Sequence, residues 1–219
     1  MRDIGIRIEK KSGNSYQDPG FTILAFSGEE AVSENFSFSV LLRLAAQTDL
    51  EQFLEKDGSI NLKSIWRICL TAAPAAEDSG ETVFEEQKRF IHCLTGQIEI
   101  ESSIDELHVS VMMVPMVLPL TKASISRSFY EKSVPELVRF MQDRIKSIAP
   151  DAGGLLEFDF TQLSEGLADS YEKWTTRVQF QESDWNFLSR VLERDGIYFF
   201  IQNDEQKASY IFVDEFLDH

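Results

Sequence analysis

Hydrophobic and polar residues alternate along much of the first half of the chain, which is the period of strands with one buried face. The alternating segments are residues 4–8, 36–42, 60–70 and 107–113. Phe21 to Phe26 forms a continuous apolar run that ends at Ser27-Gly28-Glu29, and it predicts a further strand. Short strands separated by turns are typical of a sandwich or a barrel, so we predict a barrel-like β domain over residues 1–120.

A helix of about four turns is predicted between Ser133 and Ile148. Ser133 and Glu136 have the spacing of a capping box, and Pro135 fits the first helical turn. The apolar stripe expected to face a sheet consists of Val134, Leu137, Val138, Met141, Ile145 and Ile148.

The sequence predicts one other short helix in the first half, which Thr48 caps with Glu51 three residues later and Gly58 ends. Residues 149–154 are rich in Pro and Gly and predict a loop with a sharp reversal. Residues 155–160 predict a strand after that loop.

The segment that begins at Trp174 predicts a strand followed by a helix. Val178 and Phe180 alternate with polar residues as in a strand. Ser183 is placed to cap the helix, and Asp184 puts an anion at its positive end. The apolar stripe of this helix is Trp185, Phe187, Leu188, Val191 and Leu192, and its polar side carries Arg190 and Arg194.

Gly196 is predicted to end this helix, because only glycine adopts a positive φ without steric strain. Residues 197–201 then predict a buried strand, and a turn at 203–205 returns the chain as a hairpin to a strand at 210–213. The residues that define this motif are Ser183, Asp184, Trp185, Leu188, Arg190, Leu192, Gly196, Ile197, Tyr198 and Phe199.

The run VQFQESDWNFLSRVLERDGIYFF, from Val178 to Phe200, resembles the most recognisable stretch of the VgrG spike proteins of bacterial type VI secretion and of their phage tail hub relatives. Residues 21–38, 89–96 and 117–138 are similar to further family segments in the same order. The resemblance therefore covers most of the chain.

This resemblance implies a non-enzymatic structural role. It implies a homotrimer in which two similar barrels per chain give near-sixfold symmetry, so that the trimer caps a hexameric tube of an Hcp-like or phage tail tube protein. Effectors or spike-tip proteins are further implied partners, and the implied route is cytoplasmic assembly followed by secretion through the apparatus. The residues do not separate a secretion spike from the baseplate hub of a phage tail or prophage-derived particle.

Family members continue into an OB-like domain and a β-helical needle, whereas this chain stops at His219. Two alternatives stay open at this point: a fragment of a longer protein, or a short relative whose spike is carried by another chain.

The composition excludes several classes of function. The 219 residues carry 21 Lys plus Arg against 37 Asp plus Glu, a net charge of -16, and such a surface repels a polyanion, so nucleic-acid binding is not expected. The 17 Phe are better suited to fill a barrel than to leave the cavity that a small-ligand-binding barrel needs. Neither a membrane span nor the apolar run of a signal peptide is predicted.

The sequence contains few candidate catalytic or metal-binding residues. Glu182 and Asp184 could be imagined as an acid and base pair, but an acidic residue in a first helical turn is ordinarily a capping device. His92 and Cys93 point to opposite faces of a strand and cannot share a metal ion, and Cys69 is expected to be a buried thiol like Cys93. A hydrolase would need a catalytic set that we do not find, so we predict no catalytic, cofactor or metal site.

The predicted fold class is thus α+β and mainly β, with barrel-like hub domains and short helices that resemble the phage tail hub fold. Residues 1–120 form the first barrel-like domain, residues 121–173 a helical connection and loop, and residues 174–219 the incomplete start of a second barrel-like unit.

Overall fold

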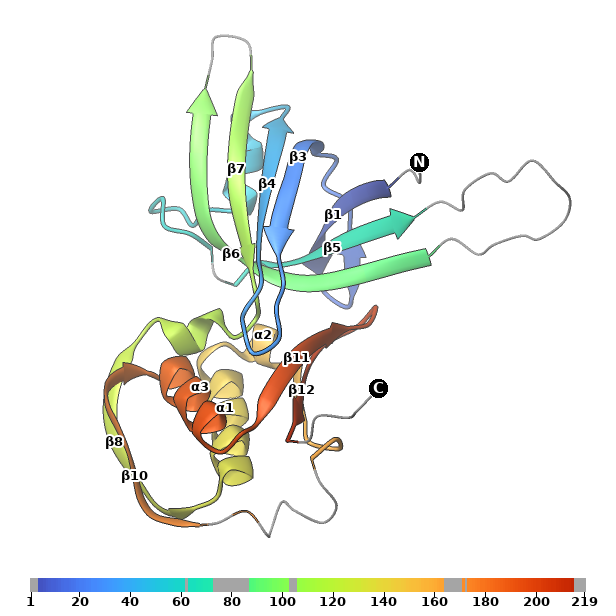
Figure 1. The fold of residues 1–219 in the computed structure, drawn as a ribbon. Coiled ribbons are helices and arrows are strands. Elements are labelled where there is room, and N and C mark those ends of the chain that lie inside the picture. Colours follow the sequence, from blue (N-terminus) through green and yellow to red (C-terminus); the bar gives the residue numbers. More distant parts are fainter. Residues whose placement is uncertain are drawn as a thin grey trace, which may run out of the picture. The chain divides into compact units, whose positions relative to one another are not determined.

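The computed structural model describes residues 4–61, 63–72, 87–102, 106–163, 171 and 173–214 (Figure 1). The chain forms two compact units. Unit 1 comprises residues 1–28, 37–114 and 203–205, and unit 2 comprises residues 29–36, 115–202 and 206–219. Apart from the turn at 203–205, the predicted connection and the predicted second barrel both fall in unit 2. The predicted three-part division of residues 1–219 stays a prediction.

A seven-stranded sheet forms the body of unit 1. Its strands are β1 (Ile4–Ser12), β2 (Ser15–Gln17), β3 (Thr22–Glu29), β4 (Ser37–Leu44), β5 (Ile65–Ala72), β6 (Gln87–Ser102) and β7 (Leu107–Val114). Their order across the sheet is β2-β1-β5-β6-β7-β4-β3. This sheet confirms the mainly β character that the alternation predicts.

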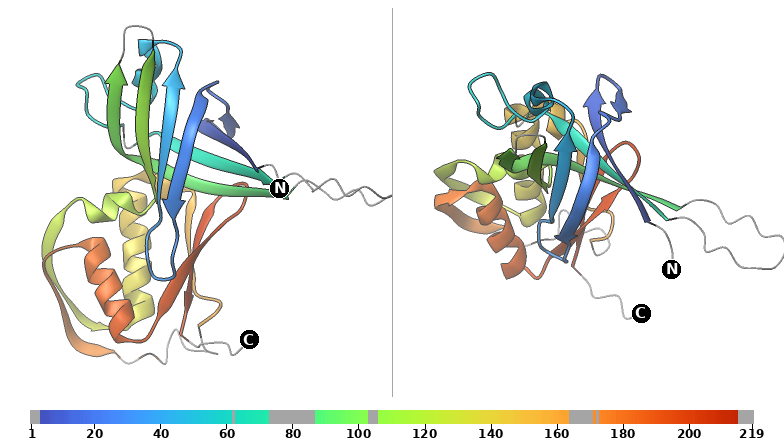
Figure 2. Two further views of the ribbon diagram at one scale, coloured as in Figure 1. Left: turned by 45° about the horizontal axis from the view of Figure 1, so that its top comes forward. Right: turned by 90° about the horizontal axis from the view of Figure 1, so that it is seen from above.

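The long strand β6 gives the sheet its curvature. Its first half pairs with β5 and its second half with β7, and the register shifts between Thr95 and Gln97. Gly96 lies at this shift, where an added Cβ would come within 2.8 Å of a Val114 methyl group. Figures 1 and 2 show that β6 is curved, and a register shift of this kind bends a strand.

The core of unit 1 follows the predicted alternation. On β4 the side chains of Phe38, Val40, Leu42 and Leu44 are buried, and on β7 those of Val109, Val111 and Met113. Strand β5 is buried on both faces from Ile65 to Cys69. Trp66 stacks on Phe53 with ring centroids 4.6 Å apart, so the deepest part of this core is aromatic.

Three details of unit 1 differ from the sequence prediction. The short helix is the 3-10 helix η1 (Gln47–Gln52), and the cap is formed by Asp49, whose carboxylate accepts a hydrogen bond from the Ala46 N–H at 3.1 Å. Gly58 has a positive φ of 82° but lies in a later turn. Strand β5 begins at Ile65, five residues after the predicted start. Strand β3 is an edge strand whose side chains are mostly exposed, because only one neighbouring strand covers it.

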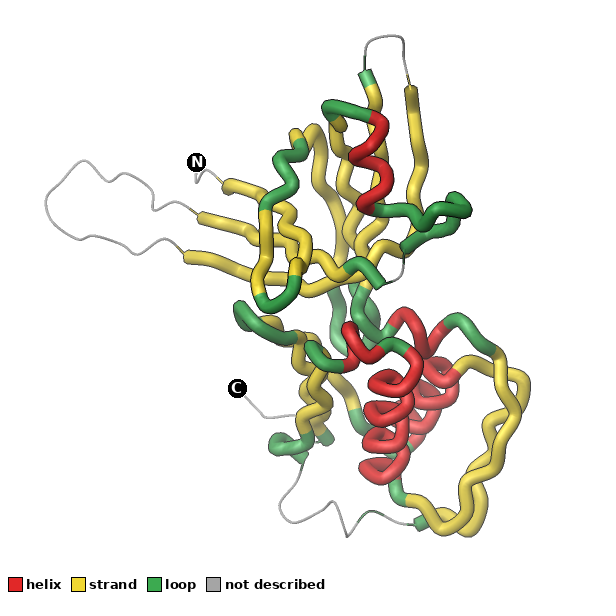
Figure 3. The backbone as a smooth tube through the Cα atoms, turned by 180° about the vertical axis from the view of Figure 1, so that it is seen from behind, coloured by secondary structure: helices red, strands yellow, loops and turns green. Residues whose placement is uncertain are grey.

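Unit 2 combines helices with two small sheets. Its elements are η2 (Leu118–Thr121), β8 (Ser124–Lys132), α1 (Val134–Ile148), α2 (Pro150–Gly153), β9 (Leu156–Asp159), β10 (Trp174–Ser183), α3 (Asp184–Arg194), β11 (Tyr198–Asn203) and β12 (Ala208–Val213). Strands β8 and β10 form an antiparallel two-stranded ribbon, and β12 lies between β11 and β9 and runs parallel to β9. Helices α1 and α3 lie side by side (Figure 3).

Helix α1 begins with the Glu136 half of its predicted capping box. The Ser133 N–H donates to the Glu136 carboxylate at 2.9 Å, and this bond, together with Lys132, lowers the pKa of Glu136 to about 2. The predicted stripe is buried except for Ile148, which is 39% exposed at the end of the helix. The predicted loop after it contains the short helix α2. In the described part of the chain, none of the helices has the length and apolar character needed to span a membrane.

Candidate functional site

The motif from Ser183 to Phe199 organises unit 2 around α3. The Ser183 hydroxyl accepts a hydrogen bond from the Asn186 N–H at 3.1 Å, so the predicted cap is present. The predicted stripe is buried: Trp185, Phe187, Leu188, Val191 and Leu192. Of the residues after the helix, Ile197 and Phe199 are buried and Tyr198 is half-buried. Arg190 lies on the exposed side.

Asp184 has a larger role than that of a helix-end anion. It is 2% exposed, and one carboxylate oxygen accepts hydrogen bonds from Arg127 at 2.9 Å and from the Gln179 amide at 3.0 Å. The other oxygen accepts from Arg144 at 3.2 Å. This one side chain therefore joins β8, α1, β10 and α3. The sequence does not predict the contacts of these two arginines, because no local spacing relates them to Asp184.

Glu182 has a separate partner. Its carboxylate pairs with Arg190 at 2.5 Å, and the same guanidinium donates to the Val178 carbonyl at 3.2 Å. Glu182 and Asp184 thus each bind their own arginines, and the arrangement joins structural elements of unit 2 through ion pairs. This geometry gives no support to the acid and base pair that we considered for these two carboxylates.

Strand β10 buries its polar face and exposes its apolar face. Val178 and Phe180 are 49% and 69% exposed, whereas Arg177 and Gln179 are buried. Arg177 donates to Asp195 at 2.7 Å, and Gln179 reaches Asp184. The alternation correctly predicts a strand, but the apolar side chains lie outside because ion pairs and hydrogen bonds occupy the inner face.

Gly196 has a φ of 72°, which confirms the predicted left-handed end of α3. A Cβ at this position would meet nothing within 4 Å, so the cost of a side chain is a backbone cost alone. We expect Gly196→Val to lower the free energy of unfolding by about 1 to 2 kcal/mol, because a β-branched residue is strained at positive φ. Gly196→Asn should cost less, since Asn tolerates this conformation. Chemical denaturation of both variants measures the difference, and equal values would contradict the assignment.

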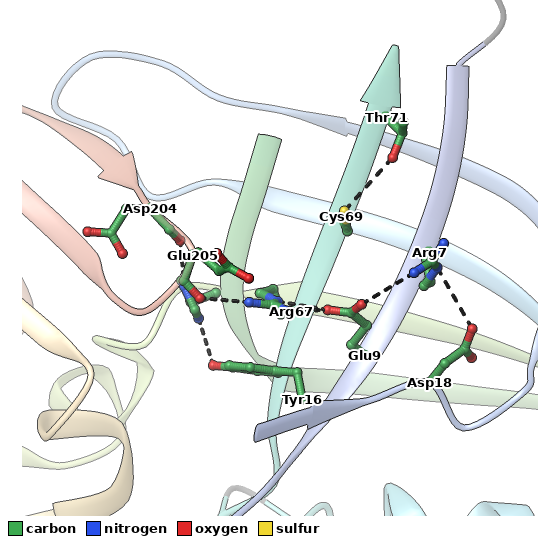
Figure 4. Close-up of polar contacts among 10 residues, drawn as sticks. Arg7, Glu9, Tyr16, Asp18, Arg67, Cys69, Thr71, Asp204 and Glu205 are labelled. Atoms are coloured by element: carbon green, nitrogen blue, oxygen red, sulfur yellow. Dashed lines mark hydrogen bonds and ion pairs between the residues drawn. The ribbon is translucent and has the colours of Figure 1, made fainter. Parts of the chain in front are cut away.

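Unit 1 contains a second polar cluster, centred on Arg67 (Figure 4). Arg67 is 8% exposed, and its guanidinium donates twice to the Glu9 carboxylate, at 2.5 and 2.8 Å. It also donates to the Glu205 carbonyl at 2.7 Å. The guanidinium lies over the rings of Tyr16 and Phe90, at 4.1 and 4.6 Å from their centroids. A buried charge is thereby paired, hydrogen-bonded and covered by aromatic faces.

His92 completes this cluster. Its Nδ1 lies 2.8 Å from the Tyr16 hydroxyl and its Nε2 lies 2.9 Å from the Asp204 carbonyl, which fits a neutral ring that donates from Nε2 and accepts at Nδ1. The His92 backbone N–H donates to the Asn203 side chain at 3.1 Å. Cys93 is buried, and among the described residues no cluster of His, Cys, Asp and Glu is arranged to bind a metal ion. His92 and its partners thus hold the turn at 203–205 within unit 1.

A pH dependence follows from His92, because burial lowers the pKa of its ring below the ordinary 6.5. The unfolded chain binds the proton more readily than the folded chain, so stability falls as the pH drops below about 6.5 toward the folded-state pKa. We expect urea unfolding to show this loss in the wild type and in the control His108→Gln. His92→Gln should flatten it. A wild-type slope retained in His92→Gln would contradict this assignment.

Comparison with known proteins places these features in a family. The family model described as phage tail baseplate hub (GPD) matches residues 29–216, which include the whole motif of unit 2. The type VI secretion system spike protein VgrG1c of Pseudomonas aeruginosa is 28% identical over 109 residues, which are 50% of this chain and 13% of that protein.

Two solved structures share the fold. A type VI secretion component of E. coli, described as structurally similar to the T4 bacteriophage tail proteins gp27 and gp5, aligns with a TM-score of 0.63 and 18% identity over 97% of this chain and 49% of the other. A chain of the Francisella PdpA-VgrG complex aligns with a TM-score of 0.65 and 14% identity over 100% of this chain and 32% of the other. This chain thus spans at most about half the length of these proteins. The α+β, mainly β hub fold predicted from the sequence is confirmed.

Proposed function

This chain belongs to the phage tail baseplate hub family, and from that membership we propose that it is the structural hub segment of a contractile injection machine, namely the base of a VgrG-like type VI secretion spike. The observation that carries the proposal is the family match over residues 29–216. The identity to a type VI secretion spike protein favours the secretion machine over other members of the family.

The role of the segment is mechanical and not catalytic. The motif residues cap a helix, fill a core or form ion pairs, as Ser183, Leu188 and Asp184 do. Such buried, mutually paired groups hold strands and helices in a fixed arrangement. This is the property that a rigid assembly platform requires.

In the complete protein, three copies surround one axis and cap a hexameric tube protein. Effectors or spike-tip proteins are the further partners, and the structural likeness to a chain of the PdpA-VgrG complex supports this part of the proposal. The assembly forms in the cytoplasm and leaves the cell through the injection apparatus. Closed rotational symmetry also gives open sheet edges such as β3 a partner.

The experiment that tests the function is deletion of the gene in its own host. Release of the tube protein into the medium should stop and should return with the wild-type gene. Light scattering of the complete protein should give the mass of a trimer. Unchanged tube release, or a stable dimer, would overturn the proposal.

The alternative is the baseplate hub of a phage tail or prophage-derived particle, which the description of the family itself favours. The same deletion distinguishes the two machines. Loss of phage-like particles from the culture medium, seen by electron microscopy, would identify a particle hub. Loss of contact-dependent tube release without such particles would identify a secretion spike.

A further inference from the structure

All three residues of the turn at 203–205 are hydrogen-bonded to the rest of unit 1. The Asn203 side chain accepts a hydrogen bond from the His92 backbone N–H at 3.1 Å, and the Asp204 carbonyl lies 2.9 Å from His92 Nε2. The Glu205 carbonyl accepts a hydrogen bond from Arg67 at 2.7 Å. Two of these three contacts involve His92, which is fully buried, so this residue is the main attachment of the turn.

The hydrogen bonds of the His92 ring fit its neutral form. Nε2 faces the Asp204 carbonyl, which can only accept, so Nε2 carries the proton. Nδ1 then accepts from the Tyr16 hydroxyl at 2.8 Å. A second proton on the ring would have to bind at Nδ1, where the Tyr16 hydroxyl already donates. The closed arrangement therefore accommodates a charged ring only if Tyr16 reverses its hydrogen bond.

The charges around the ring also oppose its protonation. The titratable and charged groups that face or adjoin His92 are Glu9 of β1, Tyr16 of β2, Arg67 of β5, Cys93 of β6, and Asp204 and Glu205 of the turn. Arg67 is a buried cation whose charge is already paired with Glu9. The carboxylate of Asp204 favours a protonated ring, but this side chain is exposed and water screens it. Burial is the largest effect and Arg67 adds to it, so together they lower the pKa of the ring.

Opening of the turn removes these obstacles. Once the turn moves away, the Nε2 side of the His92 ring contacts water instead of the Asp204 carbonyl, and the pKa of the ring returns toward its ordinary 6.5. The open form then binds a proton more readily than the closed form, so acid shifts the equilibrium toward the open form. Closure is fully favoured above about pH 6.5 and weakens as the pH falls from there toward the lower pKa of the closed form.

The turn can open while the sheet of unit 1 stays folded. Residues 203–205 lie outside the seven-stranded sheet, so their release breaks none of its strand pairs. Their three side chains are polar, and those of Asp204 and Glu205 are exposed, so opening removes little apolar contact. A segment with few apolar contacts opens at a lower free energy than the whole unit unfolds.

We propose that His92 is an acid-sensitive latch for the turn at 203–205. The neutral ring holds the turn against β6, and protonation of the ring releases the turn while the sheet of unit 1 stays folded. This conformational change is distinct from the global loss of stability expected in acid, because it is confined to the turn and its attachment. It also does not depend on the proposed function, since every group involved lies within this chain.

The backbone amide of His92 reports the state of the latch, because its acceptor is the Asn203 side chain. Hydrogen exchange of the complete protein, read by mass spectrometry at single-amide resolution, measures its protection at about pH 7.5 and about pH 5. After correction for the intrinsic exchange rate, protection should fall at least about threefold at the lower pH. The Ser133 amide is the matched control. It also donates to a side chain, that of Glu136, whose pKa of about 2 keeps it ionised, so its protection should not change.

Two variants identify the titrating group. His92→Gln cannot be protonated in this range, and its amide side chain still offers one acceptor and a donor, so the protection of the residue 92 amide should no longer depend on pH. His108→Gln removes a partly exposed histidine that pairs with Glu106, and it should keep the pH dependence of the wild type.

The wild type alone decides the proposal if His92→Gln fails to fold. Loss of protection at the His92 amide, with the amides of β4 and β7 still protected, supports the latch. Equal protection of the His92 amide at the two pH values would overturn it. So would a parallel loss in β4 and β7, because unit 1 would then unfold as a whole. A pH dependence that persists in folded His92→Gln would assign the opening to another group and likewise overturn the proposal.

Discussion

Replacing Arg67 by alanine should lower the free energy of unfolding of unit 1 by about 4 kcal/mol, the largest effect that we expect from a single substitution. The change leaves the Glu9 carboxylate, whose side chain is 11% exposed, with only the longer ion pair to Arg7 at 3.8 Å, whose own side chain is 61% exposed. It also removes the donor to the Glu205 carbonyl and the packing against Tyr16 and Phe90. Urea unfolding followed by circular dichroism measures the loss.

An exposed ion pair in the same unit provides the control. Arg43 and Glu106 lie 3.5 Å apart with side chains 47% and 46% exposed, so Arg43→Ala should cost less than about 1 kcal/mol. Arg67→Lys should recover part of the stability, because it keeps the charge but loses the planar fork. Similar losses for Arg67→Ala and Arg43→Ala would show that burial does not govern the Arg67 cluster.

Replacing Asp184 by alanine should cost about 3 kcal/mol in unit 2. Two guanidinium groups would lose their anion, and the buried Gln179 amide would lose one acceptor. The cost is below that of Arg67→Ala because Arg127 and Arg144 keep 20% and 32% of their side chains exposed, so water partly replaces the carboxylate. Thermal and urea unfolding of the variant provide the measurement.

Glu182→Ala is the matched control for Asp184→Ala. Its partner Arg190 is 52% exposed, so this loss should stay below about 1 kcal/mol. Asp184→Asn should lie between the two, since the amide keeps one acceptor oxygen but no charge. A Glu182→Ala variant as unstable as Asp184→Ala would show that the Asp184 network contributes no more than a surface pair.

The family, the fold class and the local structure follow from the sequence. Glu136 accepts from the Ser133 N–H at the start of α1, Ser183 caps α3 and Gly196 ends it, all as predicted. These features involve residues only a few positions apart, and the conformational preferences of such short segments are set locally. The alternation in β4 and β7 also predicts their buried faces, because a sheet with one solvent-exposed face has apolar residues at every second position of its strands.

The tertiary structure alone decided which distant residues meet. Asp184 binds arginines 57 and 40 positions away, and Arg67 binds Glu9 and Glu205 across 58 and 138 positions. No periodicity encodes such pairs, because they depend on how separate elements pack. The same reason explains β10, where the alternation indicates a strand but not which of its faces is buried. The polar face is buried because Gln179 donates to Asp184 and Arg177 donates to Asp195. A prediction from the hydrophobic pattern places the apolar side chains of a strand in the core. In β10 the buried ion pairs and hydrogen bonds instead place the polar side chains inside and the apolar ones outside.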